Sequence, residues 1–217
     1  ICIGLLVLFV LLLLLDPNHP LASREVCLIL APSRDEAAPG TRLATLFDGP
    51  GMQAPPANAE ACYFPPGALA RRDEAADIAF YARPRLVQHL DARCRAAVAE
   101  LHDKLLRPGS RVLDLMASHD SHLPPALDLE LCGLGLNDEE LAANPRLAER
   151  VVKDLNACPL LPWADARFDA VICTASIEYL LRPAAVLAEA RRVLKPGGLM
   201  LLSFSDRWFP TKAIAVW

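Results

Sequence analysis

Apolar residues recur with two different periods between Arg111 and Phe204. Short apolar runs, typical of buried strands, alternate with segments in which apolar residues return every three or four positions, as on one face of a helix. We expect strands over 111–115, 129–136, 150–153, 169–174 and 199–204, and helices over 138–143 and 183–194. This alternation predicts an α/β fold with a mostly parallel sheet and flanking helices.

A longer helical pattern precedes the first strand. It begins near Pro84, which suits a first helical turn, and stops before Pro108-Gly109. Its apolar positions are Leu86, Val87, Leu90, Cys94, Val98, Leu101 and Leu105. We expect this helix to cover one face of the sheet, and we expect Gly197 and Gly198 to end the helix over 183–194.

The first 79 residues differ in character from the rest. Residues 1–15 are uninterruptedly apolar but shorter than the roughly 20 residues of a spanning helix, which favours a signal or truncated anchor segment over a buried helix or a mistranslated start. The Pro- and Ala-rich residues 16–79 predict a linker or loosely packed arm, and residues 80–217 the α/β domain. Because the chain stops within an apolar run at Trp217, we expect this domain to be incomplete at its C-terminus.

Composition narrows the partners and the compartment. A net charge of −4 over 217 residues gives no general attraction to nucleic acid. The seven cysteines are widely spaced, and Cys132 and Cys173 lie in apolar strand patterns, which suggests buried thiols in a reducing environment. The sequence leaves localisation open between a membrane or an organelle such as the plastid and, as an alternative, the cytoplasm.

The predicted topology places a ligand site. In open parallel sheets, ligands bind beyond the carboxyl ends of the strands, near the switch in strand order. Here that edge is formed by the loops after residues 115, 136, 153 and 174.

Three blocks in this domain carry a family resemblance: VLDL, DLNACPLLPWADARFDAV and RVLKPGG. Residues 112–205 resemble the type 11 methyltransferase domain of class I S-adenosylmethionine (SAM) dependent enzymes. With FYARPRLVQHLD and SFSDRWFPTKAI included, residues 80–217 resemble a poorly characterised methyltransferase-like group of plants, algae and bacteria. The resemblance implies a Rossmann-like fold, with SAM as cofactor.

Two family positions are altered. The family's GxGxG loop after VLDL is replaced here by Met116, Ser118 and Asp120, which leaves backbone amides and the Ser118 and Ser121 hydroxyls for ligand contact. The acid that usually binds the ribose hydroxyls falls on Gly135. Asn137 or Asp138 is a substitute acceptor, but Asn137 also suits the cap of the next helix, with Glu140 completing a capping box.

Two other positions keep the family pattern. Asp114, at the end of the first strand, matches the acid that orders the loop and the methionine end of SAM. Asp154 and Leu155 match the pair that contacts adenine. A purely structural role remains open for Asp114, and a turn carboxylate for Asp154.

Methyl transfer needs alignment, a dry pocket and, for some acceptors, a base. Glu178, Tyr179 and His122 are the candidates for the base, although a loop-stabilising hydrogen bond is the alternative for His122. His119 and His122 lack an identifiable third metal ligand, so we predict no metal site. The segment of Arg207, Trp208, Phe209, Pro210 and Lys212 is a candidate acceptor wall with cations for an anionic acceptor.

The sequence therefore predicts a SAM-dependent methyltransferase acting on a small-molecule or lipid-like acceptor. The alternative is a methyltransferase-like protein that binds a ligand without catalysis, because the glycine loop and the ribose acid have both changed. We expect no nucleic acid partner, and membrane association through Ile1–Leu15. The oligomeric state is open.

Overall fold

The computed structural model describes residues 66–204 and 209–217, so the predictions for Ile1–Leu15 fall outside the described residues. Its centre is a parallel five-stranded sheet with the order β3-β2-β1-β4-β5. The strands are β1 (Arg111–Leu115), β2 (Glu130–Gly135), β3 (Leu147–Val152), β4 (Phe168–Thr174) and β5 (Leu194–Ser203). The predicted α/β class and parallel sheet are confirmed.

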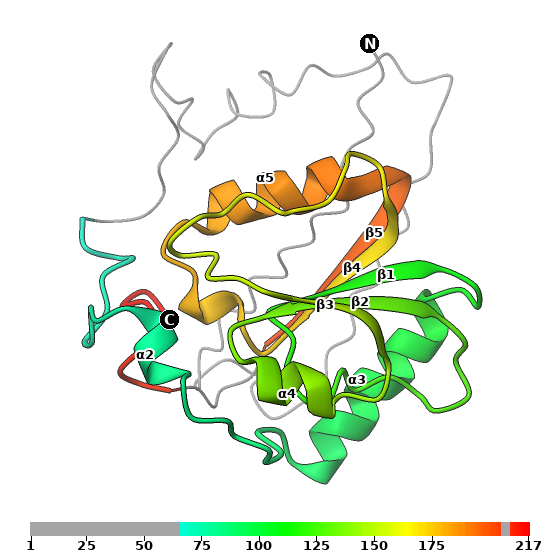
Figure 1. Ribbon diagram of the computed structural model, residues 1–217, viewed down its shortest axis with the longest axis horizontal. Helices are drawn as coiled ribbons and strands as arrows, with labels where there is room; N and C mark the ends of the chain where they lie inside the picture. Colours follow the sequence, from blue (N-terminus) through cyan, green and yellow to red (C-terminus); the bar gives the residue numbers. More distant parts are fainter. Residues whose placement is uncertain (1–65, 205–208) are drawn as a thin grey trace, which may run out of the picture. The chain divides into compact units, whose positions relative to one another are not determined.

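Helices cover both faces of this sheet (Figure 1). The helices of the described residues are α2 (Asp77–Phe80), α3 (Ala92–Leu105), α4 (Asp138–Ala143), the short 3-10 helix η1 (Ile177–Tyr179) and α5 (Pro183–Val193). Helix α5 lies on one face, where Val186, Ala190 and Val193 pack against the strands. Helices α3 and α4 lie on the other face. Cys132 and Cys173 are buried within their strands, also as predicted.

The helix predicted from Pro84 begins instead at Ala92. Asp91 is its N-cap, and the Asp91 side chain accepts a hydrogen bond from the Cys94 amide at 2.9 Å. The backbone before Asp91 does not continue the helix, because the Arg85 amide donates a hydrogen bond to Glu140 Oε1 at 2.7 Å. Residues 84–90 therefore run beside the carboxyl end of the sheet, and the prediction of a helix there was wrong.

The KPGG segment also differs from its prediction. Helix α5 ends at Val193, before the glycines are reached, and β5 begins at Leu194. Leu194 pairs with Phe168 and Leu199 with Ala170, so residues 195–198 bulge out of the ladder. Gly197 has a φ of +77°, a conformation that suits glycine, and it serves this bulge and not the helix end. Strand β3 likewise begins earlier than predicted, at Leu147.

Residues 66–79, which belong to the predicted arm, pack on the domain. Their backbone is hydrogen-bonded to that of residues 209–217 at three places: Asp73 N to Thr211 O, Ala215 N to Ala70 O and Val216 N to Ala68 O. The described residues belong to one compact unit. Among its described residues, no helix combines the length and the apolar character needed to cross a membrane.

Candidate functional site

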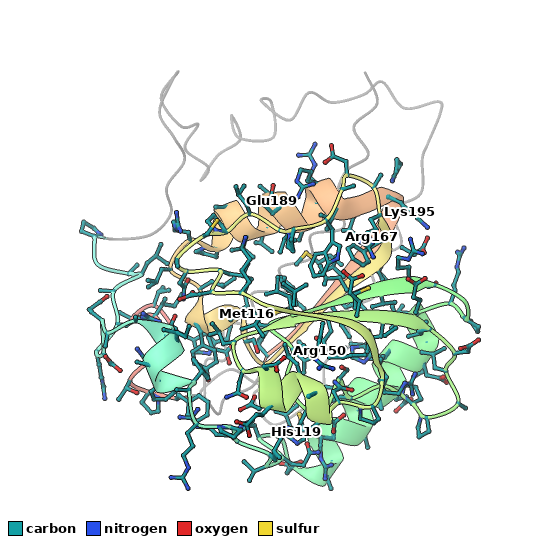
Figure 2. The ribbon with its side chains drawn as sticks, viewed as in Figure 1. Met116, His119, Arg150, Arg167, Glu189 and Lys195 are labelled. Atoms are coloured by element: carbon teal, nitrogen blue, oxygen red, sulfur yellow. The ribbon has the colours of Figure 1, made fainter. Side chains whose placement is uncertain are left out.

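A pocket with a cavity volume of about 260 Å³ lies at the carboxyl end of the sheet. The four loops predicted to form a site all contribute to it, with residues from 116–122, 135–137, 153–156 and 174–176. Met116, which follows β1, lies at this end of the sheet, whereas Arg167 and Lys195 lie at the opposite end (Figure 2). Those two cations are engaged there by Glu149 and Asp169.

The loop after β1 comes very close to β2. Met116 has a φ of 61°, a left-handed conformation that a glycine would adopt without strain. The next residue, Ala117, donates its amide to Leu134 O at 2.7 Å. A Cβ atom added to Gly135 would lie 2.3 Å from Ala117 O, so only glycine fits at the end of β2. The loop has lost its glycines, and the close backbone approach now depends on a glycine in the neighbouring strand.

Asp114 is the next-to-last residue of β1 and is almost fully buried. Burial raises the pKa of its carboxyl to about 7, and a hydrogen bond with Ser121 opposes that rise. Asn144 Nδ2 in turn donates to Ser121 Oγ at 2.9 Å and to Ser118 O at 3.0 Å. Asp114 thus contacts the loop through Ser121 and also lines the pocket, and its contact with SAM stays a prediction.

Asn137 caps α4, as predicted. Its Oδ1 accepts from the Glu140 amide at 3.0 Å, and its Nδ2 donates to Tyr81 O at 2.9 Å. The Glu140 side chain does not complete a capping box. Glu140 Oε1 accepts from the Arg85 amide and Oε2 accepts from Ser118 Oγ, both at 2.7 Å, so this carboxylate faces the pocket. Asp138 does not line the pocket and lies near Arg150 instead, at 3.4 Å.

Asp154 and Leu155 both line the pocket after β3. Asp154 Oδ1 accepts from the Asn156 amide at 2.8 Å and from the Ala157 amide at 3.1 Å, as a turn carboxylate does. No hydrogen bond within the described residues involves the second carboxyl oxygen, which leaves it available to a ligand. Leu155 is buried and belongs to the core cluster under α5, so its position is fixed by packing.

Aromatic side chains close one side of the pocket. The ring centroids of Phe209 and its neighbours lie 5.4 to 6.4 Å apart, in edge or tilted contacts. We call this set the aromatic wall: Tyr81, His89, Tyr179 and Phe209, which line the pocket, and Phe80, which contacts Phe209 without lining it. The guanidinium of Arg85 lies 4.6 Å from the centre of the Phe80 ring and also lines the pocket.

The three candidates for the base are placed very differently. Glu178 is fully buried and does not line the pocket. Tyr179 lines it, but burial raises the pKa of its hydroxyl, which accepts a hydrogen bond from the Phe209 amide at 2.9 Å. His122 lines the pocket, and burial lowers the pKa of its imidazole, which favours the neutral form that can take a proton. Its Nδ1 lies 3.2 Å from Asp120 Oδ2.

The predicted cationic acceptor wall is not formed by Lys212. Its ammonium is fully buried, 3.1 Å from Asp73 Oδ2 and 3.3 Å from Asp77 Oδ1, and it donates to Ala75 O at 2.6 Å. Lys212 therefore has a structural role, because a buried cation needs these partners. Phe209 does line the pocket, whereas Arg207 and Trp208 fall outside the described residues.

Comparisons with known proteins show which proteins this domain is similar to. Residues 121–202 match a family model described as methyltransferase domain. A ubiquinone/menaquinone biosynthesis C-methyltransferase UbiE from Cupriavidus metallidurans is 30% identical over 115 residues, 48% of this chain and 47% of that protein. The 27-O-demethylrifamycin SV methyltransferase of Amycolatopsis mediterranei is 30% identical over 125 residues, covering 51% and 46%. By this match, residues 121–202 belong to a class I SAM-dependent methyltransferase domain.

The methyltransferase domain is also similar to solved structures. One is the phosphoethanolamine N-methyltransferase 2 of Haemonchus contortus in complex with S-adenosyl-L-methionine, at a TM-score of 0.43 and 21% identity, covering 51% of this chain and 27% of that one. The chain spans about half the length of the curated relatives it matches.

Sequence patterns missed several pocket residues of this methyltransferase domain. Arg85 and His89 were assigned to a helix, and Glu140 was considered only as part of a cap. Their contacts join segments far apart along the chain, such as the Arg85–Glu140 hydrogen bond, which spans 55 positions. The cluster of aromatic and basic residues in FYARP was the available signal, and it lay just ahead of the predicted helix.

Proposed function

We propose that this chain binds SAM over the carboxyl ends of β3, β2 and β1 and methylates a small, largely apolar acceptor. One observation carries the proposal: a single pocket in a methyltransferase domain is lined by Asp114, Asp154 and Leu155, the positions at which the family resemblance expects contacts with the methionine end and with adenine. Bound SAM would supply an electrophilic methyl group on a sulfonium.

The residues present fit such a ligand. The second oxygen of Asp154 is an acceptor for an amino group, and Leu155 offers an apolar surface beside it. Asp114 is a carboxyl suited to an ammonium, because a cation at that point would favour its charged form. The loop after β1 brings backbone groups to the same pocket without glycines.

The aromatic wall supports an apolar acceptor. Tyr81, Tyr179 and Phe209 present ring surfaces to the pocket from three separate segments. One relative is named for ubiquinone and menaquinone biosynthesis and another for 27-O-demethylrifamycin SV; for this chain we propose only an acceptor of comparable apolar character. His122 is the proposed base where the acceptor must lose a proton, since it is the candidate that combines pocket lining with a lowered pKa.

The family match and the relatives are methyltransferases, and they give no support to the non-catalytic alternative. Membrane association through Ile1–Leu15 and the localisation remain proposals from the sequence.

Calorimetric titration of S-adenosylhomocysteine, the product form of the cofactor, tests the proposal. The wild-type protein should bind it, and Asp114→Ala and Asp154→Ala should each weaken binding about tenfold or more, because hydrogen bonds to charged groups contribute about 1.5–3 kcal/mol. Asp138→Ala is the matched control, since Asp138 is exposed and outside the pocket. Absence of binding by folded wild-type protein would contradict the proposal.

Transfer of a labelled methyl group from SAM to a panel of phenols and quinols then tests catalysis. Product formation that falls in His122→Gln, with S-adenosylhomocysteine affinity retained, would support the role of His122 as a base. Equal rates of methyl transfer in the wild-type protein and in His122→Gln would exclude His122 as the base.

A further inference from the structure

The pocket contains a carboxylate that the family pattern does not place there. Glu140 lies in α4, is 8% exposed, and lines the pocket beside the loop that follows β1. Side chains this polar are seldom so buried without a structural or ligand-binding reason. We propose that Glu140 binds the two ribose hydroxyls of SAM, an inference that rests on the proposed function.

The hydrogen-bonding capacity of Glu140 leaves room for a diol. Within the described residues, Oε1 accepts one hydrogen bond, from the Arg85 amide, and Oε2 accepts one, from Ser118 Oγ. An ionised carboxylate has about four acceptor positions, two on each oxygen. One position on each oxygen therefore remains, and two neighbouring hydroxyls on a ribose supply two donors at matching spacing.

The usual place for a ribose-binding acid is closed in this chain. An acid at Gly135 would need a Cβ atom 2.3 Å from Ala117 O, and that oxygen belongs to the backbone and cannot rotate away. The side chain of Asn137 is already hydrogen-bonded through both of its polar atoms. Its Oδ1 caps α4, and its Nδ2 donates to Tyr81 O. Glu140, on the first turn of α4, reaches the same region from the helix instead of from the strand.

The order of the carboxyl groups across the sheet supports this assignment. Asp154 follows β3, Glu140 lies in the helix that follows β2, and Asp114 is the next-to-last residue of β1, with strand order β3-β2-β1. SAM carries its hydrogen-bond donors in a corresponding linear order: the adenine amino group, the ribose hydroxyls and the methionine ammonium. A cofactor lying across these strands would place its ribose at Glu140.

Two contacts hold Glu140 in this position. The Ser118 hydroxyl fixes one oxygen from the loop after β1, and the Arg85 amide fixes the other from the segment before α3. Fixed acceptors bind a ligand with a smaller loss of side-chain freedom than mobile ones. The serine in place of the family's loop glycine thus positions Glu140.

The test compares S-adenosylhomocysteine with its analogue lacking both ribose hydroxyls, titrated calorimetrically into wild-type protein and Glu140→Gln. We expect Glu140→Gln to weaken binding of S-adenosylhomocysteine about tenfold or more, and binding of the analogue by less than about threefold. Glu139→Gln is the matched control on the same helix, with an exposed side chain. Glu140→Asp, which keeps the charge but withdraws the carboxylate, should lose the discrimination as well.

Two results would overturn the inference. Equal weakening of both ligands by Glu140→Gln would mean that the residue only supports the pocket, and unchanged affinity for S-adenosylhomocysteine would exclude contact with the ribose. In both cases the proposed function survives, because the wild-type protein still binds S-adenosylhomocysteine. Failure of the wild-type protein to bind either ligand would overturn both proposals.

Discussion

The carboxyl group of Glu178 is fully withdrawn from solvent, and neither of its oxygens has a hydrogen-bond partner among the described residues. Burial without a partner disfavours the charged form, which raises the pKa of this carboxyl from 4.5 to about 7. In the unfolded chain the same group ionises near its ordinary pKa. Between about pH 4.5 and about pH 7, the Glu178 carboxyl is therefore protonated in the folded state and ionised in the unfolded state.

This difference predicts how stability changes with pH. Below about pH 4.5 the group is protonated in both states and costs nothing; as pH rises from about 4.5 to about 7, stability falls by about 3 kcal/mol, and above pH 7 the loss stays constant. We expect Glu178→Gln to exceed the wild-type free energy of unfolding at pH 8 and to match it near pH 4.5. Urea denaturation at both pH values measures this, with Glu139→Gln as the exposed control. Equal stabilities at pH 8 would contradict the assigned burial cost.

At the scale of single residues, local contacts were predictable and distant ones were not. The Asn137 cap was predicted because its partner lies three positions away. The role of Glu140 was missed because its partners Ser118 and Arg85 lie 22 and 55 positions away. Asp114 and Asp154 were identified through resemblance, and their ligand contacts remain predictions.

At the scale of elements, the loop after β1 combines a family position with an unusual residue. Met116 adopts a φ of 61°, which costs a non-glycine residue about 1–2 kcal/mol. Its side chain packs against the core cluster, and this packing offsets part of the cost.

Comparing glycine with alanine at position 116 isolates the backbone strain, because neither residue keeps the packing. We expect Met116→Gly to be more stable than Met116→Ala by about 1 kcal/mol in thermal or urea unfolding. The order should reverse in α3, where Ala96→Gly should lose about 1 kcal/mol as in any exposed helix. A Met116→Ala protein at least as stable as Met116→Gly would show that the loop relaxes out of the left-handed conformation.

The errors in the predicted elements share a physical cause. The apolar spacing from Leu86 onward fits a helix, but the Arg85 amide is bound by Glu140, and Asp91 caps a helix that starts later. The glycines of KPGG fit a helix end, but the sheet uses them in a bulge opposite residues 168–170. Helix α4 was predicted with its observed bounds because its cap and its apolar positions are local.

At the scale of the whole domain, a buried charge cluster joins the two ends of the described chain. Its members are Arg71, Asp73, Asp77 and Lys212, and Asn156 Nδ2 also donates to Asp77 Oδ2 at 2.7 Å. The cluster fixes α2, which leads directly to Tyr81 in the aromatic wall. The sequence predicted the parallel sheet but not the ion pairs between residues 71–77 and Lys212. No local sequence pattern indicates contacts between residues more than a hundred positions apart.

Removing the cation should therefore destabilise the domain. We expect Lys212→Ala to lower the free energy of unfolding by about 3 kcal/mol or more. In this variant the buried Asp77 carboxylate would keep Arg71 as an ion-pair partner but lose Lys212. Lys104→Ala is the matched control: Lys104 forms an exposed ion pair with Glu100, and its loss should cost less than about 1 kcal/mol. Urea denaturation of both variants gives the comparison. Similar small losses would show that Arg71 alone compensates Asp77.

The contact between Ala117 O and Gly135 also constrains how this chain can change over evolution. A side chain entering β2 at position 135 collides with the loop as it stands, and a more open loop would first have to give up the Ala117–Leu134 hydrogen bond. We therefore expect each change alone to destabilise the domain, so that positions 117 and 135 are coupled and their neighbourhoods change together.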